Sequence, residues 1–225
     1  MLALLYDVHG NLPALEAVLA DARGAGATRF LLGGDYGLFG AWPAETVARL
    51  RELDATWIRG NVDRWCAAPD DAPDEVRPAI EGCRELLDPE TVSELAALPE
   101  QEVADSTRYC HASPRSDVRG FPPAASEHDA ELLGDAGEPR IVFGHTHIQF
   151  TRPGPAGVEL VNPGSVGIPL DSDHRAAYAL TRDDGSIELR RVAYDHAASA
   201  AAVRERLGDA GEVAARRIEL ARFGV

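Results

Sequence analysis

Five short, largely apolar runs in this chain each end in a glycine or directly in a polar residue that can bind a metal. The runs cover residues 2–6, 30–32, 56–59, 107–110 and 141–143. Ligand sites in open α/β sheets form beyond the carboxyl ends of the strands, so five such strand ends predict one site where they converge. The polar residues that follow the runs are Asp7, His9, Asp35, Asn61, His111, His145 and His147.

The tetrapeptide Gly144-His145-Thr146-His147 follows the last of these runs. Side chains two residues apart in an extended backbone point to the same side, so both imidazoles can reach one point beyond the sheet edge. Alone, such a pair is as often two surface histidines that make ordinary hydrogen bonds. The aspartates and histidines at the other strand ends favour a metal site instead.

The first half of the chain alternates strand and helix. Asn11 is placed to cap a helix that runs to Gly24, and Pro43 opens a second helix that ends before the strand at Thr56. This order predicts parallel strands joined by helical crossovers. From Arg140 onward, short runs separated by turns predict hairpins and a second, largely antiparallel sheet.

Two segments depart from this order of strands, helices and hairpins. Residues 67–105 are rich in Pro, Asp and Glu and are predicted to form a helical insertion, which either covers the site as a lid or packs on the flank of the sheet. Residues 195–225 are predicted to form a helical tail with an apolar stripe. The tail packs either on the core or on a second subunit, so a homo-oligomer is one possible outcome.

Length and charge limit the class of protein. With 225 residues and 45% hydrophobic content, we expect a single domain over residues 1–225. The net charge is −15 and no basic run occurs, which argues against long nucleic acids and anionic membranes as partners. The first residues do not resemble a signal peptide, so a cytoplasmic protein is expected. Cys66, Cys83 and Cys110 form no pattern typical of disulfides or a zinc ribbon.

The motifs together resemble the calcineurin-like metallophosphoesterases, most closely the small bacterial and archaeal phosphoesterase (phosphodiesterase) branch. The resemblance extends from Leu2 to about Leu180. The motifs that carry it, in chain order, are Asp7-Val8-His9-Gly10-Asn11, Gly33-Gly34-Asp35, Arg59-Gly60-Asn61-Val62-Asp63, His111, Gly144-His145-Thr146-His147 and Asn162-Pro163-Gly164-Ser165.

This resemblance implies an α/β fold, a four-layer α-β-β-α sandwich of two mixed β-sheets flanked by helices. It also implies two divalent transition-metal ions, Mn²⁺ first, with Fe, Zn²⁺ or Ni²⁺ as alternatives, because Ca²⁺ and Mg²⁺ rarely recruit so many histidines. Asp35 is implied to bridge the two ions. One ion would be held by Asp7, His9, Asp35 and His147, and the other by Asp35, Asn61, His111 and His145.

The implied activity is hydrolysis of phosphodiesters or small phosphate esters by a hydroxide that bridges the metals, with a small phosphorylated substrate as the partner. The implied catalytic residues are Asp7, His9, Asp35, Asn61 and His111. The alternatives within enzymes are a phosphomonoesterase, a phosphoprotein phosphatase or a dinucleoside-polyphosphate hydrolase. A scaffold subunit that binds metal without turnover is the alternative outside enzymes.

The chain departs from the family pattern at one position of chemical importance. Many members have a histidine that can act as general acid where this chain has Val62. The stretch Gly167-Ile168-Pro169-Leu170 is apolar where relatives often have polar residues. The predicted substrate contacts are Asn11, Arg59, Arg64 and Arg115, and ordinary salt bridges are an equally good explanation of the arginines.

Overall fold

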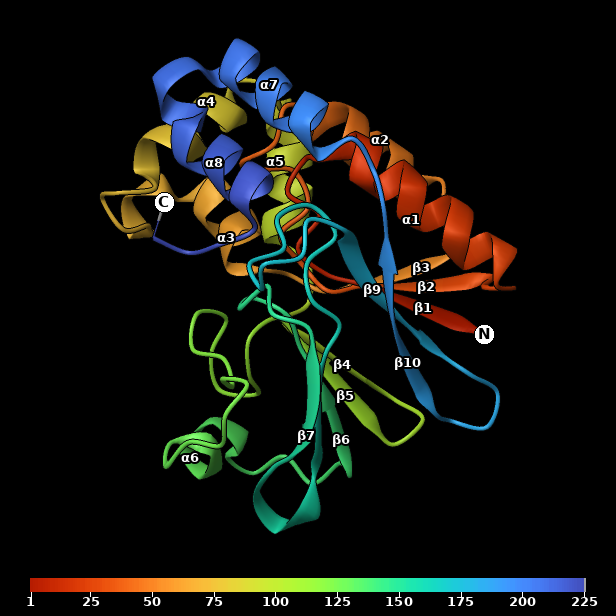
Figure 1. Ribbon diagram of the computed structural model, residues 1–225. Coiled ribbons are helices and arrows are strands. Elements are labelled where there is room, and N and C mark those ends of the chain that lie inside the picture. Colours follow the sequence, from red (N-terminus) through yellow and green to blue (C-terminus); the bar gives the residue numbers. More distant parts are fainter. Residues whose placement is uncertain (225) are drawn as a thin grey trace.

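The computed structural model describes residues 1–224 as two five-stranded mixed sheets packed face to face, with helices on the outside (Figure 1). This confirms the fold class. The first sheet has the order β10-β9-β1-β2-β3, with β1–β3 parallel and β9 antiparallel to β1. Its strands are β1 (Leu2–Leu5), β2 (Arg29–Leu32), β3 (Ala55–Trp57), β9 (Ala176–Thr181) and β10 (Ile187–Val192).

The second sheet has the order β4-β5-β6-β8-β7, in which β5, β6 and β8 are parallel and the edge strands are antiparallel. Its strands are β4 (Gln101–Ala104), β5 (Thr107–Cys110), β6 (Arg140–Val142), β7 (Phe150–Pro153) and β8 (Glu159–Asn162).

The prediction of a largely antiparallel second sheet after Arg140 is therefore wrong in two respects. The β9–β10 hairpin joins the first sheet, and β6 pairs with β8 in parallel because β7 comes between them in the chain and lies antiparallel on the other side of β8. A short turn sets the direction of the next strand but not the sheet edge that the hairpin joins. That edge is decided by burial: Tyr178 and Leu180 pack against the first helix, while Ala179 faces the second sheet.

The side chains of β1 point alternately to the two faces of the first sheet, and this explains how the helix layer and the second sheet pack on it. Ala3 and Leu5 pack in a cluster with the first helix, whereas Leu4 and Tyr6 pack against residues of the second sheet. Successive side chains of a strand point to opposite faces, so a strand buried on both faces is apolar throughout. The continuous run at residues 2–6 thus belongs to a strand covered by a helix on one side and by a sheet on the other.

Helices α1 (Leu12–Gly24) and α2 (Pro43–Arg51) cover the outer face of the first sheet (Figure 1). The side chain of Asn11 caps α1, and Pro43 opens α2, as predicted. The outer face of the second sheet carries a thinner layer, the short helix α6 (Asp129–Leu133) and its flanking loops, with Phe121, Leu132 and Phe143 in the contact.

Residues 67–105 contain α4 (Arg77–Arg84) and α5 (Pro89–Ala96), but also strand β4 at their end. Helix α5 packs on the flank, with Leu95 in the core cluster of the first sheet, while Val76 and Ala79 of the α4 region line a cavity at the candidate site. Packing on the flank describes α5, whereas a lid formed by the α4 region stays a prediction. Helix α3 (Asn61–Ala67) precedes the segment and was not predicted.

The tail consists of α7 (His196–Leu207) and α8 (Glu212–Leu220), which pack on each other and on the chain's own core through Val203, Ile218 and Ile168. Val225 lies outside the described residues. The rings of His174 and His196 stack at 4.4 Å between centroids. Within residues 1–224, no helix has the length and apolar character needed to cross a membrane.

Candidate metal centre

All seven predicted ligands lie in loops or first helical turns at the carboxyl ends of β1, β2, β3, β5 and β6. Because the sheets face each other, these ends meet at one edge of the sandwich. Asp7, Asp35, Asn61 and His111 are at most 3% exposed. Five of the seven have positive φ angles between 49° and 63°, a conformation that is uncommon outside glycine and clusters at functional sites. These five are Asp7, His9, Asp35, His145 and His147.

Two groups of side chains are close enough to hold a cation. Asp7, His9 and His147 form one group, and Asp7, Asp35 and His111 form the other. His9 Nε2 is 3.1 Å from His147 Nε2, and Asp7 Oδ1 is 3.4 Å from His147 Nε2. Asp35 Oδ2 is 3.4 Å from His111 Nε2 and 3.8 Å from His9 Nε2, so this carboxylate reaches both groups.

The buried oxygen Asp7 Oδ1 is the strongest local indication of a cation site. It makes no hydrogen bond within the described residues, yet the Nε2 atoms of His9, His111 and His147 lie within 3.4 to 3.9 Å of it. An unpartnered buried carboxylate oxygen is costly, and a metal ion between it and neutral imidazoles removes that cost. The donor set therefore fits a divalent transition metal.

In His9, His111 and His147, a hydrogen bond from Nδ1 fixes the orientation of the imidazole ring. Nδ1 of His9 donates to Leu38 O at 3.1 Å, Nδ1 of His111 to Gly33 O at 2.9 Å, and Nδ1 of His147 to Ile168 O at 2.6 Å. A proton on Nδ1 leaves the Nε2 lone pair free toward the centre, which is the tautomer that binds metal. Backbone carbonyls thus set three ligands before any ion arrives.

Asn61 lies between His111 and His145. The amide atom placed as Asn61 Oδ1 is 2.9 Å from His145 Nδ1 and 2.9 Å from His111 Nε2. If this atom is the carbonyl oxygen, it faces other acceptor atoms, and a bound cation would remove the repulsion between them. If the amide is rotated by 180°, the NH₂ group takes this position and donates hydrogen bonds instead. Either orientation brings Asn61 to the two histidines with which it was predicted to share an ion.

Burial and neighbouring charges perturb the ionisation of the cluster. Burial lowers the pKa of His9 to about 4, helped by His147, and burial with the nearby His111 lowers the pKa of His145 to about 4. Burial opposes a charge on His111 too, but Asp35 outweighs it and raises the pKa of His111 to about 10. Burial disfavours the charged form of Asp35, yet His111 lowers its pKa below the ordinary value.

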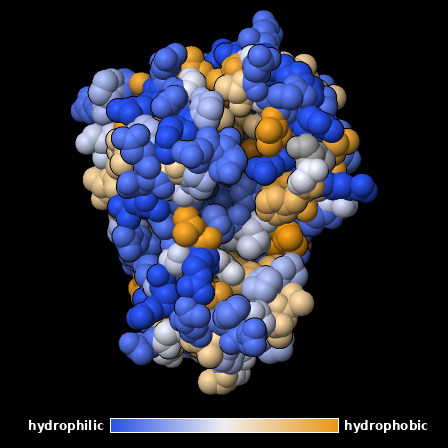
Figure 2. Space-filling view, turned by 90° about the vertical axis from the view of Figure 1, so that its left-hand side faces the viewer, coloured by the Kyte–Doolittle hydropathy of each residue, from blue (hydrophilic) through white to orange (hydrophobic). Residues whose placement is uncertain are grey.

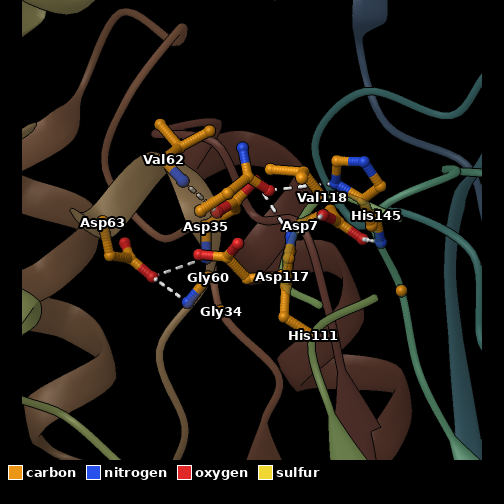
Figure 3. Close-up of polar contacts among 12 residues, drawn as sticks. Asp7, Gly34, Asp35, Gly60, Val62, Asp63, His111, Asp117, Val118 and His145 are labelled. Carbon is orange, nitrogen blue, oxygen red and sulfur yellow. Dashed lines mark hydrogen bonds and ion pairs between the residues drawn. The ribbon is translucent and has the colours of Figure 1, made fainter. Parts of the chain in front are cut away.

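Asp63 supports the loop that carries Asp35. Its carboxylate accepts hydrogen bonds from the backbone N–H groups of Asp35 and Gly60, each at 2.8 Å (Figure 3). It also accepts one from the backbone N–H of Tyr36 at 3.1 Å. Burial, together with the charge of Asp35, raises the pKa of Asp63 to about 7. Asp63 therefore holds the backbone on which Asp35 is carried.

Glycines allow the backbone at two strand ends to approach the side chains of Asp7 and Asp35 closely. A Cβ on Gly144 would lie 2.5 Å from Asp7 Oδ2, and one on Gly60 would lie 2.0 Å from Asp35 Oδ1. The motif at residues 162–165 also holds these loops: Ser165 Oγ donates to Asp7 O at 2.8 Å, and Asn162 Nδ2 donates to Gly144 O at 2.9 Å. Cys110, which precedes His111, points away from the cluster into the core with Phe143.

Two cavities adjoin the cluster. The α8 cavity, about 320 Å³, has its floor at the metal-site residues and its walls in α3, the α4 region and the C-terminal residues from Ala210 to Phe223. The arginine cavity, about 310 Å³, is lined by His111, Ser113, Arg59, Arg64 and Arg115 among others. Figure 2 shows a hollow on one face of the molecule with hydrophobic side chains at its rim.

The predicted substrate contacts separate into two sets. Arg59, Arg64 and Arg115 meet in the arginine cavity, where Arg59 pairs with Glu100 and Arg64 with Asp117. Asn11 does not reach the centre, and its amide is used within the fold: it caps α1 and donates to Gly167 O and to the hydroxyl of Tyr194. Its predicted contact with substrate stays a prediction.

The C-terminal wall of the α8 cavity was missed by sequence reasoning. Val213, Ala214 and Phe223 line the cavity together with Trp65 and Val62. An apolar stripe on a helix shows that one face is buried but not which surface covers it. No spacing in the sequence could link α8 to residues about 150 positions earlier.

Two mixed sheets packed face to face, with aspartates and histidines at the strand ends of both sheets, define the class of fold to which this protein belongs. The model of the calcineurin-like phosphoesterase superfamily domain matches residues 1–185. The chain therefore belongs to the calcineurin-like phosphoesterase superfamily.

Individual relatives agree with the family match. An uncharacterized protein of Methanocaldococcus jannaschii is 29% identical over 219 residues, covering 87% of this chain and 88% of that protein. The crystal structure of a metallophosphoesterase from Sphaerobacter thermophilus is similar with a TM-score of 0.82 and 27% identity, over 98% of this chain and 99% of that one. A hypothetical protein from Pyrococcus horikoshii shares the fold, with a TM-score of 0.82 at 20% identity over 100% and 99% of the two chains.

Proposed function

We propose that this chain is a binuclear metal-dependent phosphoesterase that hydrolyses phosphodiesters or small phosphate esters. The observation that supports this most directly is the buried, unpartnered oxygen Asp7 Oδ1, faced by three imidazole nitrogens from three different strand ends. Membership of the superfamily and two overlapping groups of ligand residues support the same conclusion.

The ligand assignment follows the family pattern. Asp7, His9, Asp35 and His147 would hold one ion, and Asp35, Asn61, His111 and His145 the other, with Asp35 shared. Two divalent ions in such a site lower the pKa of water and stabilise negative charge at phosphorus. Oxygen and imidazole donors together suit Mn²⁺, which we place first, and also Fe, Zn²⁺ and Ni²⁺.

The chain's own residues contribute orientation rather than a nucleophile. The Nδ1 contacts of three histidines and the Asp63 contacts to the backbone hold the donors in place before binding. Val62, whose backbone N–H donates to Asp35 Oδ1 at 2.9 Å, brings only methyl groups to the α8 cavity. No proton donor stands at this position, so esters with good leaving groups are the favoured substrates.

The two cavities support a diester over a monoester. Both adjoin ligand residues, His9 and His147 on one side and His111 on the other. A phosphodiester has two organic substituents and can place one in each cavity, whereas a monoester would leave one side empty. Arg115 makes no ion pair within residues 1–224 and is available to a substrate oxygen.

Metal reconstitution tests this proposal. We expect about two ions of Mn²⁺, Zn²⁺ or Ni²⁺ per chain by elemental analysis, hydrolysis of bis(p-nitrophenyl) phosphate, and loss of that activity with chelator. The variant His128→Ala, at an exposed histidine outside the cluster, is the control and should keep both ions. One ion or none would contradict the two-metal assignment, and two ions without hydrolysis of any ester would favour the scaffold alternative.

A further inference from the structure

The α8 cavity differs in chemistry from the metal cluster at its floor. Above His9, Asp35, Asn61, His145 and His147, its lining is dominated by apolar groups. Its volume of about 320 Å³ is within the range of small-molecule sites. The apolar wall residues that matter here are Val62, Trp65, Val76, Val213, Ala214 and Phe223.

The C-terminal wall is built firmly into the fold although it lies beyond the family match at residues 1–185. Arg204 of α7 pairs with Glu212 and Glu219 of α8, and Ile218 packs with Ile168. Ile168 also accepts the hydrogen bond that orients His147, so the segment that orients a ligand also contacts the helix that walls the cavity. The apolar stretch at residues 167–170 therefore joins these two parts of the site.

Apolar side chains remain in contact with solvent at the cavity rim. Val213 is 51% exposed and Phe223 is 55% exposed, and both line the cavity. Arg217 lines it as well, with its guanidinium over the Phe223 ring at 5.5 Å and with no ion pair within the described residues. Exposed apolar groups gathered at a concave site next to catalytic residues are typical of ligand binding rather than of an inert surface.

We propose that the α8 cavity binds the apolar, aromatic organic group of the phosphate ester, so that the C-terminal helices select the substrate. This rests on the proposed function, since it assumes that the phosphate sits at the metal cluster. The flat Trp65 and Phe223 rings and the methyl groups of Val62 and Val213 suit an aryl group, and the lining offers few partners for the hydroxyls of a sugar. Arg217 stands at the rim for a polar substituent on the far side of the ring.

Binding of non-hydrolysable phosphonates tests this proposal. On protein loaded with Mn²⁺, calorimetry should show that 2-naphthylmethylphosphonate binds about tenfold or more tightly than methylphosphonate, because only the former carries an apolar group into the cavity. Val213→Asp and Phe223→Ala should reduce that preference severalfold. The matched control Leu220→Asp changes an exposed residue of the same helix that does not line the cavity, and it should keep the preference.

A neutral probe separates this proposal from the proposed function. On the metal-free protein, 2-naphthylmethanol should bind to the wild type and to Leu220→Asp, and severalfold more weakly to Val213→Asp. That result supports the cavity assignment even if no ester is hydrolysed. Equal binding of the two phosphonates to the wild type, no binding of any probe, or equal effects of Val213→Asp and Leu220→Asp would overturn it.

Discussion

At the residue scale, the candidate site combines strained backbone conformations with a buried carboxylate oxygen that makes no hydrogen bond within the described residues. Five ligand residues have left-handed backbone conformations, and Asp7 Oδ1 is buried without a partner. Each of these features costs free energy in a protein without ions and is expected where strain serves a function. Because Asp35 Oδ2 reaches imidazoles of both ligand groups, a change there should affect the whole centre.

Asp35→Asn should reduce bound metal from about two ions to one or fewer and lower kcat/KM by about 100-fold or more. The asparagine oxygen can still accept from Val62 N–H, so the fold should persist. Elemental analysis and phosphodiester hydrolysis measure the two effects. Asp135→Asn, at an exposed loop residue, is the matched control, and equal losses in both variants would contradict the assignment of Asp35.

Val62→His should restore a general acid and help poor leaving groups most. General acid catalysis contributes about 10²–10⁴-fold, and esters of alkyl alcohols depend on it far more than nitrophenyl esters. The measurement is kcat/KM across esters of graded leaving-group pKa, with Val62→Leu as the control for side-chain size. A flat wild-type profile with rate-limiting chemistry would show that another residue already acts as the acid.

At the element scale, one cluster of polar side chains, Asp21, Tyr178 and Arg190, joins helix α1 to β9 and β10 at the edge of the first sheet. Asp21 accepts hydrogen bonds from Arg190 of β10 and from the hydroxyl of Tyr178 of β9. Arg190, with the Tyr178 hydroxyl, holds the pKa of Asp21 below its ordinary value. This contact joins the C-terminal hairpin to α1 and so helps to place that hairpin in the first sheet.

The pH dependence of stability should report this cluster. The pKa of Asp21 is depressed in the folded state, so its contribution is fully present above the unfolded value of about 3.9 and is lost as the pH falls below it toward the folded pKa. Asp21→Asn should lower the free energy of unfolding by about 1 kcal/mol at pH 7, with a smaller difference near pH 3. Denaturant unfolding measures this, with Asp135→Asn as the control. A difference that does not change with pH would argue against the ionised carboxylate as its source.

At the scale of the whole molecule, the two sheets bring strand ends from both halves of the chain to one edge (Figure 1). Helix α8 of the tail completes the cavity beside it. The net charge of −15 surrounds this site with a negative field. Small anionic esters can be drawn in by local groups such as Arg115 and by bound metal, whereas a long polyanion meets the field of the entire surface.

Duplex DNA should therefore bind negligibly at physiological salt, because the phosphate contribution that dominates nonspecific affinity is repulsive here. A mobility-shift assay with the Mn²⁺-loaded protein measures this, and the same assay at low salt shows whether any binding is electrostatic. Tight, salt-sensitive binding would favour a nuclease over an enzyme for small esters.

The sequence alone determined the strands that carry the candidate ligands. The runs before Asp7, Asp35, Asn61, His111 and His145 are strands, because apolar residues in short runs between turn residues are buried by local pattern alone. The family motifs likewise depend on residue type and order. The ligand roles and the number of ions stay predictions until metal binding is measured.

Only the tertiary structure decided which surfaces meet. It placed β9 and β10 in the first sheet, joined the amide of Asn11 to Gly167 O by a hydrogen bond, and brought α8 to the wall of the cavity. Each depends on contacts between segments far apart in the chain, where a hairpin or an amphipathic helix shows that a face must be buried but not against which partner. The sequence thus determined the chemistry at the floor of the site, and packing determined the shape and polarity of the space above it.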